Sequence, residues 1–380
     1  MHAWFLWNTY LVILDFFVAF IGFIYISESH ANIKLTSKNA LIFFLFCLST
    51  LWNSIEGIEW LSSFHPAFLL LLTLGQKEYR YLLHMWTNTY AIILSVSLIA
   101  WLGITYGSIP LPAIGTISFN NDIQYTFTNY FFCLVRNNLS LRFNSIFLEP
   151  GHVGMIAAFT LAANRFNFKK WQTISILVCS LFTLSLAGYI LIIIGLISNY
   201  ILKRQSIFQF VIGISVFGVL LMIIHNAAVS YNKGNNLYNE LIVERLEYDE
   251  DYYIVGNNRF TESTDMLFER YISSSQLVTG MPEAEYKRNI RNQTIKGAGY
   301  KLFLMQKGII GLLLILSVYI LMLKKYRDKR MGALLLMIYS LAFLQRAYPL
   351  WESWIYIFLF ASALDTLNSK SEQQRKKLIV

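Results

Sequence analysis

Charged side chains are scarce in this chain of 380 residues: they make up 14% of it, whereas about 25% is usual in soluble proteins. Hydrophobic residues make up 56%, and this combination excludes a disordered chain. Cysteine is also rare, because only Cys47, Cys133 and Cys179 are present, all in apolar stretches. So few cysteines exclude a disulfide scaffold. We therefore expect a protein whose solvent is largely lipid.

The sequence lacks the common motifs of metal, nucleotide and nucleophile chemistry. It contains no HExxH, no P-loop and no GxSxG, and its histidines are scattered. The first apolar stretch, 4–26, has neither a basic start nor a small-residue cleavage site after it. We therefore expect a retained helix there and not a signal peptide.

Long apolar runs dominate what is present. Because a transmembrane helix needs about 20 mostly apolar residues, we expect an all-α polytopic membrane protein with about 11 transmembrane helices. The stretch 171–203 is predicted to form a hairpin of two helices that breaks at Ser185–Gly188. The candidate spans are 4–26, 38–55, 58–75, 84–106, 146–164, 171–186, 187–203, 207–227, 298–323, 331–346 and 351–367.

Lysine and arginine are concentrated in six short segments between the apolar runs. These segments hold 18 of the 31 basic residues and four of the 22 acidic ones, and positive loops face the cytoplasm. Since membrane topology accounts for most of the net charge of +9, a nucleic-acid partner is not expected. The six segments are 27–38, 75–83, 164–170, 203–206, 324–330 and 368–380.

Two longer segments are predicted to lie on the opposite, outer side. The smaller is 107–145, and the larger, 228–297, carries 11 of the 22 acidic residues. Helical composition at 237–251 and 263–276 predicts short helices within the larger loop. We expect a single transmembrane domain, 1–380, into which this loop is inserted.

Arginine outnumbers lysine on the predicted outer side, although the inner loops favour lysine. A guanidinium binds phosphate oxygens through a planar fork, which an ammonium cannot do. Arg136, Arg142 and Arg346 have few acidic neighbours in the sequence and adjoin the membrane, which favours a binding role. Arginines within the acidic loop have a plainer alternative, which is pairing with its carboxylates.

Glu149 is the most unusual single residue. It precedes Pro150 at the outer mouth of a predicted span, and Pro suits the first turn of a helix. An ionisable group at membrane depth is a functional candidate, and the helix dipole favours its charged form. The alternatives are an ordinary helix cap or a partner for Arg142. His152, one turn into the helix, is a weaker candidate.

Three places in the chain resemble bacterial polysaccharide polymerases of the Wzy type, within the O-antigen ligase/polymerase superfamily. The first is Arg142-x-x-Ser145-x-Phe-x-Glu149-Pro150, where the family usually has glycine in place of Ser145. The second is the entry into the last long span, from Gly297-Ala-Gly299 to Gly308-Ile-Ile-Gly311. The third is Gln345-Arg346-Ala-Tyr-Pro349.

The resemblance implies a GT-C-like glycosyltransferase of the bacterial inner membrane, with its active site facing the periplasm. Its donor and acceptor would be repeat units on undecaprenyl diphosphate, and a chain-length regulator is a possible protein partner. Glu149 or His152 would act as general base, although Glu149 could instead orient an arginine. No metal or other cofactor is expected, because cationic side chains would bind the diphosphate: Arg136, Arg142, Arg259, Arg288, Arg291, Lys301 and Arg346.

Two other functions fit parts of this pattern. A ligase of the same superfamily would share the fold and the mechanism and differ only in its acceptor. A flippase of lipid-linked sugars would instead show inverted repeats and charges at the bilayer midplane. The gathering of unusual charges on one side with a large outer loop favours an enzyme.

Overall fold

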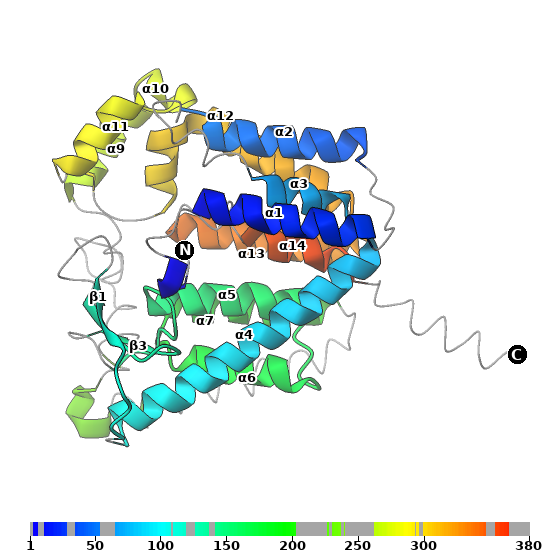
Figure 1. Ribbon diagram of the computed structural model, residues 1–380. Helices are drawn as coiled ribbons and strands as arrows, with labels where there is room; N and C mark the ends of the chain where they lie inside the picture. Colours follow the sequence, from blue (N-terminus) through cyan, green and yellow to red (C-terminus); the bar gives the residue numbers. More distant parts are fainter. Residues whose placement is uncertain are drawn as a thin grey trace, which may run out of the picture. The chain divides into compact units, whose positions relative to one another are not determined.

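The computed structural model describes residues 3–6, 11–28, 35–53, 65–107, 109–118, 126–136, 141–202, 226–227, 230–236, 239, 262–292, 294–295, 299–346 and 354–364. These residues are mostly helical (Figure 1). They belong to two compact units. The first comprises Met1–Trp4 and Met85–Asn258, and the second comprises Phe5–His84 and Arg259–Val380. The expectation of a single domain stays a prediction.

In its described residues, the first unit contains α5 (Pro150–Ala163), α6 (Trp171–Leu181), α7 (Leu186–Leu202) and a small sheet, in addition to the second part of the long helix α4. The antiparallel sheet has the order β1-β2-β3 and lies within 107–145. Its strands are β1 (Gly115–Ser118), β2 (Thr126–Asn129) and β3 (Leu134–Arg136), and α4 covers Gln76–Thr105. Two short 3-10 turns are also described, at Trp4–Leu6 and Tyr231–Gly234.

Helix α5 is held against α7 by two glycines. A Cβ at Gly188 would lie 2.8 Å from Cα of Gly154, and a Cβ at Gly154 would lie 3.1 Å from Cα of Gly188. The two helix backbones therefore touch, as small residues allow in membrane helix pairs. Figure 1 shows the two helices side by side. This contact fixes the helix whose first residue follows Glu149.

Side-chain hydrogen bonds join α5 and α6 to α4. The indole N–H of Trp86 donates to Thr160 Oγ1 over 3.0 Å, and Asn164 Nδ2 donates to Thr87 Oγ1 over 2.8 Å. The hydroxyl oxygens of Ser95 and Ser175 are 2.6 Å apart. Such bonds supply the specificity that burial alone cannot give between apolar helices in lipid.

The second unit is built from helices that come from both ends of the chain. From the N-terminal part come α1 (Leu11–Glu28), α2 (Ser37–Leu51), α3 (Pro66–Thr73) and the start of α4. From the C-terminal part come α9 (Glu262–Ile272), α10 (Gln276–Thr279), α11 (Glu283–Arg291), α12 (Tyr300–Leu323), α13 (Lys329–Gln345) and α14 (Trp354–Ala361). Figure 1 shows α9, α10 and α11 grouped beside the first turns of α12.

Aromatic side chains form the centre of the contact between α12, α13 and α14. The ring of Phe358 lies 4.8 Å from that of Tyr319 and 5.7 Å from that of Tyr339, both fully buried. The buried hydroxyl of Tyr339 donates to the carbonyl of Trp354, and that of Tyr326 donates to the carbonyl of Phe358. Each tyrosine thus satisfies its polar end while its ring fills the core.

Two of the described helices, α4 and α12, have the length and hydropathy that a membrane span needs. Only 39% of the residues in the apolar window of each helix are fully buried, so the remaining side chains are at least partly exposed. Helix α1 exposes further phenyl groups, with Phe17 59% and Phe20 63% accessible. The other nine predicted spans stay predictions, and 207–225 lies outside the described residues.

Several sequence predictions concern this architecture directly. The stretch 171–203 forms two helices as predicted, but they separate at Phe182–Ser185, a few residues before the predicted break. Helix α9 confirms the predicted helix at 263–276, whereas most of 237–251 lies outside the described residues. The sheet within 107–145 was not predicted, so the fold is mostly but not entirely helical.

The glycine contact between α5 and α7 yields a prediction for stability. Gly188→Ala places a methyl group against the Gly154 backbone, which cannot move aside as a side chain could, and should cost about 1–3 kcal/mol. Thermal unfolding of the purified protein in nanodiscs measures the loss as a lower Tm. Ile190→Ala, on an exposed part of α7, is the control and should change Tm little. An unchanged Tm for Gly188→Ala would contradict the close contact.

Candidate functional site

Glu149 occupies the position immediately before α5. Its backbone is extended, with φ −138° and ψ 147°, and Pro150 follows as the first helical residue. Proline suits that place because its fixed φ matches the helix and its missing N–H leaves no donor unsatisfied. The Glu149 carboxylate makes no capping hydrogen bond. The structure thus confirms the predicted position of Glu149 and does not support an ordinary cap.

His152 lies one turn into α5, beside the Glu149 carboxylate. Its Nε2 is 3.7 Å from Glu149 Oε2. The histidine side chain is 4% exposed and the glutamate side chain 23%, so the carboxylate is reachable from outside while the imidazole is buried. The positive end of the α5 dipole adds to the field at both groups. At this separation a carboxylate and an imidazole can both take part in the transfer of one proton.

The segment leading to Glu149 passes through a left-handed residue. Ser145 has φ +52°, a conformation that costs a residue with a side chain about 1–3 kcal/mol. Neighbours hold it there: Leu134 N–H of β3 donates to the Ser145 carbonyl over 2.8 Å, and Ser145 Oγ donates to Ser97 Oγ over 2.8 Å. A glycine at this position, as in the family that the sequence resembles, would adopt the same backbone without strain.

Arg142 directs part of its guanidinium toward the protein. Its Nε donates to the Thr183 carbonyl over 3.2 Å and its Nη2 donates to the Leu184 carbonyl over 3.0 Å. These carbonyls belong to the turn after α6, where helical partners end. The fork predicted to bind phosphate therefore ties the 142–149 segment to the turn between α6 and α7. Arg136 lies half-buried at the end of β3, paired with Phe127.

Two predicted binding residues of the second unit, Lys301 and Arg346, make contacts or are buried within the protein. Lys301 Nζ lies 2.7 Å from Asp265 Oδ1 and 5.3 Å from the centre of the Phe268 ring. Arg346 is 8% exposed and ends α13, where its backbone N–H donates to the Ala342 carbonyl. Each residue thus contributes to packing, whatever else it binds. Arg259 lies outside the described residues.

Arg288 and Arg291 differ from these cations. Both are exposed in the last turn of α11, and their spacing of three residues puts them on the same face. Their neighbour Lys287 pairs with Glu283, with Nζ 2.7 Å from Oε1. For the two arginines themselves, the described residues provide no ion pair. Positive charge also suits the negative end of α11, but that role does not require a guanidinium.

The predicted site residues therefore fall into two sets. Arg136, Arg142, Glu149 and His152 belong to the first unit, and Arg288, Arg291, Lys301 and Arg346 belong to the second. Their convergence on one cavity stays a prediction. Within the described part of the chain, no three His, Cys, Asp or Glu side chains are placed to hold a metal ion. The expectation of a metal-independent activity is not tested by that observation.

The sequence reasoning missed one polar junction in the second unit. The sequence places Lys307 among the basic residues of the outer side, embedded in a predicted span, but predicts no partner for it, and Asn53 was not singled out. The structure buries the Lys307 ammonium against the end of α2 and gives Asn53 a left-handed backbone with φ +56°. The available signal was a lysine followed by glycine inside an otherwise apolar run.

Comparison with known proteins does not extend this description. No protein-family model, no curated protein and no solved structure matches the chain. The resemblance to Wzy-type polymerases thus rests on the short motifs of the sequence alone.

The left-handed backbone at Ser145 yields a second prediction. Ser145→Gly removes the strain but also the bond to Ser97, so Tm should change little or rise. Ser145→Ala keeps the strain and loses only the hydroxyl, and it should be modestly destabilising. Ser145→Val should be the worst, because a β-branched residue rarely adopts positive φ. Thermal unfolding of the three variants gives the order, and a valine variant as stable as the glycine variant would contradict the assigned backbone.

Proposed function

We propose that the protein is a glycosyltransferase that polymerises oligosaccharide repeat units carried on undecaprenyl diphosphate, as O-antigen, capsule and exopolysaccharide polymerases do. The observation that carries this proposal is the Glu149 carboxylate, placed next to buried His152 at the start of α5 within the Arg142–Pro150 motif. The positive φ of Ser145, where the family usually has glycine, supports it. The proposed fold is GT-C-like, with about 11 spans.

The proposed reaction uses the carboxylate as a base. A hydroxyl of the acceptor sugar attacks the anomeric carbon of the donor and its proton passes to Glu149. The bond from that carbon to the diphosphate breaks, and the lipid diphosphate leaves with the electron pair. His152, 3.7 Å from the carboxylate, orients it or accepts the proton in its place. General-base assistance of this kind is worth about 10²–10⁴ in rate.

The departing diphosphate gains negative charge and needs fixed cations. Arg288 and Arg291 are suited to this role, since both are exposed on one face of α11, and Glu283 at the start of that helix pairs with Lys287. Such a guanidinium pair can bind phosphate oxygens bidentately. We propose that these two arginines bind the lipid-linked substrate, with no metal or other cofactor and no nucleic acid involved.

The proposed location is the bacterial inner membrane, with the site facing the periplasm. The apolar helices α4 and α12 and the exposed phenyl groups of α1 support a lipid environment. The lysine-rich segments, among them 324–330, support the orientation. A chain-length regulator remains a proposed protein partner.

Two alternatives keep specific support. A ligase that transfers finished glycan would use the same carboxylate and arginines with a different acceptor. A flippase gains support from α12, which loses helical geometry at Gly308, because broken helices often form transporter sites. The flippase alternative would require translocation without a new glycosidic bond, so an assay of bond formation separates it from both enzymes.

The role of Glu149 is tested by Glu149→Gln. The amide keeps the shape of the side chain but cannot accept a proton at neutral pH, so chain growth from purified lipid-linked repeat units should fall by about 10²–10⁴. The variant should insert and unfold like the wild type. Glu28→Gln, at the exposed end of α1, is the matched control. Near-normal chain growth by Glu149→Gln would remove the carboxylate from the mechanism.

The role of the α11 arginines is tested by the double variant Arg288→Lys/Arg291→Lys. Charge and helix dipole are retained while the guanidinium fork is lost, so the KM for the lipid-linked donor should rise about tenfold or more. Arg270→Lys makes the same change on exposed α9 and should have little effect. Equal KM values for the double variant and the wild type would mean that these arginines do not bind the donor.

The orientation is tested by labelling single cysteines in intact cells. The native thiols are all buried, and burial raises the pKa of Cys133 to about 12, so the native cysteines should react little with a maleimide. A membrane-impermeant maleimide should label a cysteine at exposed Met266 on α9 and miss one at exposed Lys324. The reverse pattern would place the α9–α11 segment in the cytoplasm.

A further inference from the structure

Helix α12 is discontinuous, and glycine is required where it breaks. Gly308 has φ +65° and ψ −172°, and a Cβ there would collide with the backbone of Gly280 and Val278. Gly280 also has positive φ, at +92°. Two backbones thus meet where the C-terminal end of α10 reaches the break in α12. In an apolar helix, carbonyls released by such a break must find other donors.

Three carbonyls in the turn before the break receive donors from other segments. The Leu304 carbonyl accepts from the Tyr271 hydroxyl of α9. The Met305 carbonyl accepts from the Met281 N–H over 2.7 Å. The Gln306 carbonyl accepts from Asn53 Nδ2 over 2.6 Å. The break in α12 is therefore closed by groups from α9, from the residues after α10 and from the turn after α2.

The end of α2 supplies the opposite half of this junction. Asn53 adopts the left-handed conformation with which helices commonly end, and its amide also donates to the Met281 carbonyl. The Trp52 indole N–H donates to the Thr279 carbonyl over 3.0 Å. Two consecutive side chains thus bind carbonyls on both sides of Gly280.

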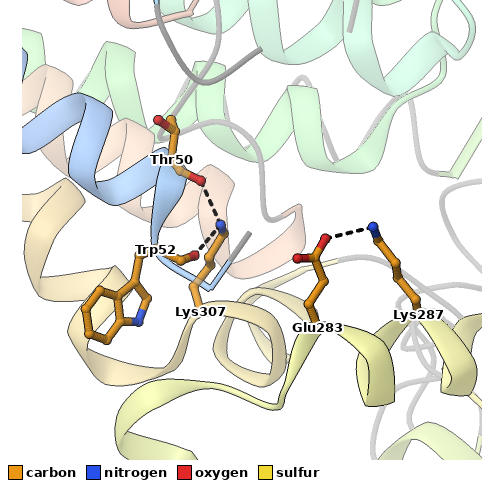
Figure 2. A network of polar contacts seen from close by, with 5 residues as sticks. All are labelled: Thr50, Trp52, Glu283, Lys287 and Lys307. Atoms are coloured by element: carbon orange, nitrogen blue, oxygen red, sulfur yellow. Dashed lines mark hydrogen bonds and ion pairs between the residues drawn. The ribbon is translucent and has the colours of Figure 1, made fainter. Parts of the chain in front are cut away.

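Lys307, the residue before the break, reaches in the other direction. Its ammonium donates to the Thr50 carbonyl over 2.9 Å and to the Trp52 carbonyl, both at the C-terminal end of α2 (Figure 2). The residue is 3% exposed, so the charge has left water and needs compensation. Carbonyls at the negative end of a helix provide part of it.

Glu283 provides further compensation for the buried charge of Lys307. Its carboxylate interacts electrostatically with Lys307 and lies 2.7 Å from Lys287 Nζ. Figure 2 shows it between the two ammonium groups. Glu283 is the first residue of α11. The charge network therefore runs from the end of α2, through Lys307, to the helix that carries Arg288 and Arg291.

Apolar packing fixes α11 to the same part of α12. Tyr286 of α11 is buried in one cluster with Met305, Met281 and Tyr271. Burial raises the pKa of Tyr286 to about 12, so it stays a neutral packing residue at physiological pH. A displacement of the first turns of α12 would therefore displace α11 as well.

We propose that Lys307 and Asn53 are positioning residues: they lock the broken helix α12 to the end of α2 and thereby fix where α11 presents Arg288 and Arg291 to an anionic substrate. The assignment of that substrate rests on the proposed function. The lock itself does not, because it is a property of the second unit alone. Lys307 and Asn53 are not expected to contact the substrate themselves.

Two variants remove the lock in different ways. Lys307→Met keeps most of the side-chain length but loses the ammonium. Asn53→Gly removes the amide and keeps a residue that adopts positive φ without strain, so it serves if the buried Lys307→Met protein fails to insert. Lys324→Met, at an exposed position just beyond α12, is the control for loss of one lysine.

The lock is measured by electron-spin distance measurement between labels at two exposed positions, Ile290 on α11 and Leu41 on α2. The wild type and Lys324→Met should give one narrow distribution, and Lys307→Met and Asn53→Gly broad ones. Narrow, unshifted distributions in both lock variants would overturn the proposal.

Kinetics with purified lipid-linked repeat units test the positioning role separately. Both lock variants should raise donor KM roughly tenfold, which corresponds to about 1.4 kcal/mol, with a smaller effect on kcat. Broad distances with unchanged KM would overturn positioning. If the wild type forms no polymer, the proposed function fails while the distance measurement still decides whether the lock exists.

Discussion

Backbone groups that lose their helical partners in apolar surroundings must be satisfied by other parts of the protein, and the second unit is organised around this constraint at Gly308. Helix α12 has the hydropathy of a continuous span, yet it departs from helical geometry at Gly308. Donors from α9, from the residues after α10 and from the turn after α2 close the break. The segment α9–α11 is thereby tied to α2 and α12.

The first unit meets a similar constraint in the segment before α5. Ser145 is held at positive φ by β3 and by Ser97, and Arg142 binds carbonyls beyond the end of α6. The glycine contact between α5 and α7 then fixes the helix itself. The result is that Glu149 reaches the start of α5 with its carboxylate beside His152 and partly exposed. Strain and close packing here serve to place one ionisable group.

Much of this arrangement could be predicted from local sequence. Pro150 predicted the start of α5 and the position of Glu149. Basic residues at both ends of the apolar run 171–203, which is too long for one upright helix, predicted a hairpin of two helices. These predictions succeeded because each depends on a few neighbouring residues.

The features that could not be predicted from the sequence depend on contacts between distant segments. The strands within 107–145 are three or four residues long, too short to show an alternating pattern. The Arg142 contacts depend on where the turn after α6 lies, which local sequence does not reveal. The break at Gly308 stays hidden because hydropathy continues through it, although Lys307 beside a glycine was a visible sign.

If the protein joins lipid-linked repeat units into a polymer, its loss should change the sizes of the glycans on the lipid carrier and on their final acceptor. In cells that lack the protein, these glycans should be single repeat units in place of long chains, with polymer restored by the wild-type gene and not by Glu149→Gln. Full-length chains stranded on the lipid carrier would show that the protein does not polymerise the units and would indicate a ligase.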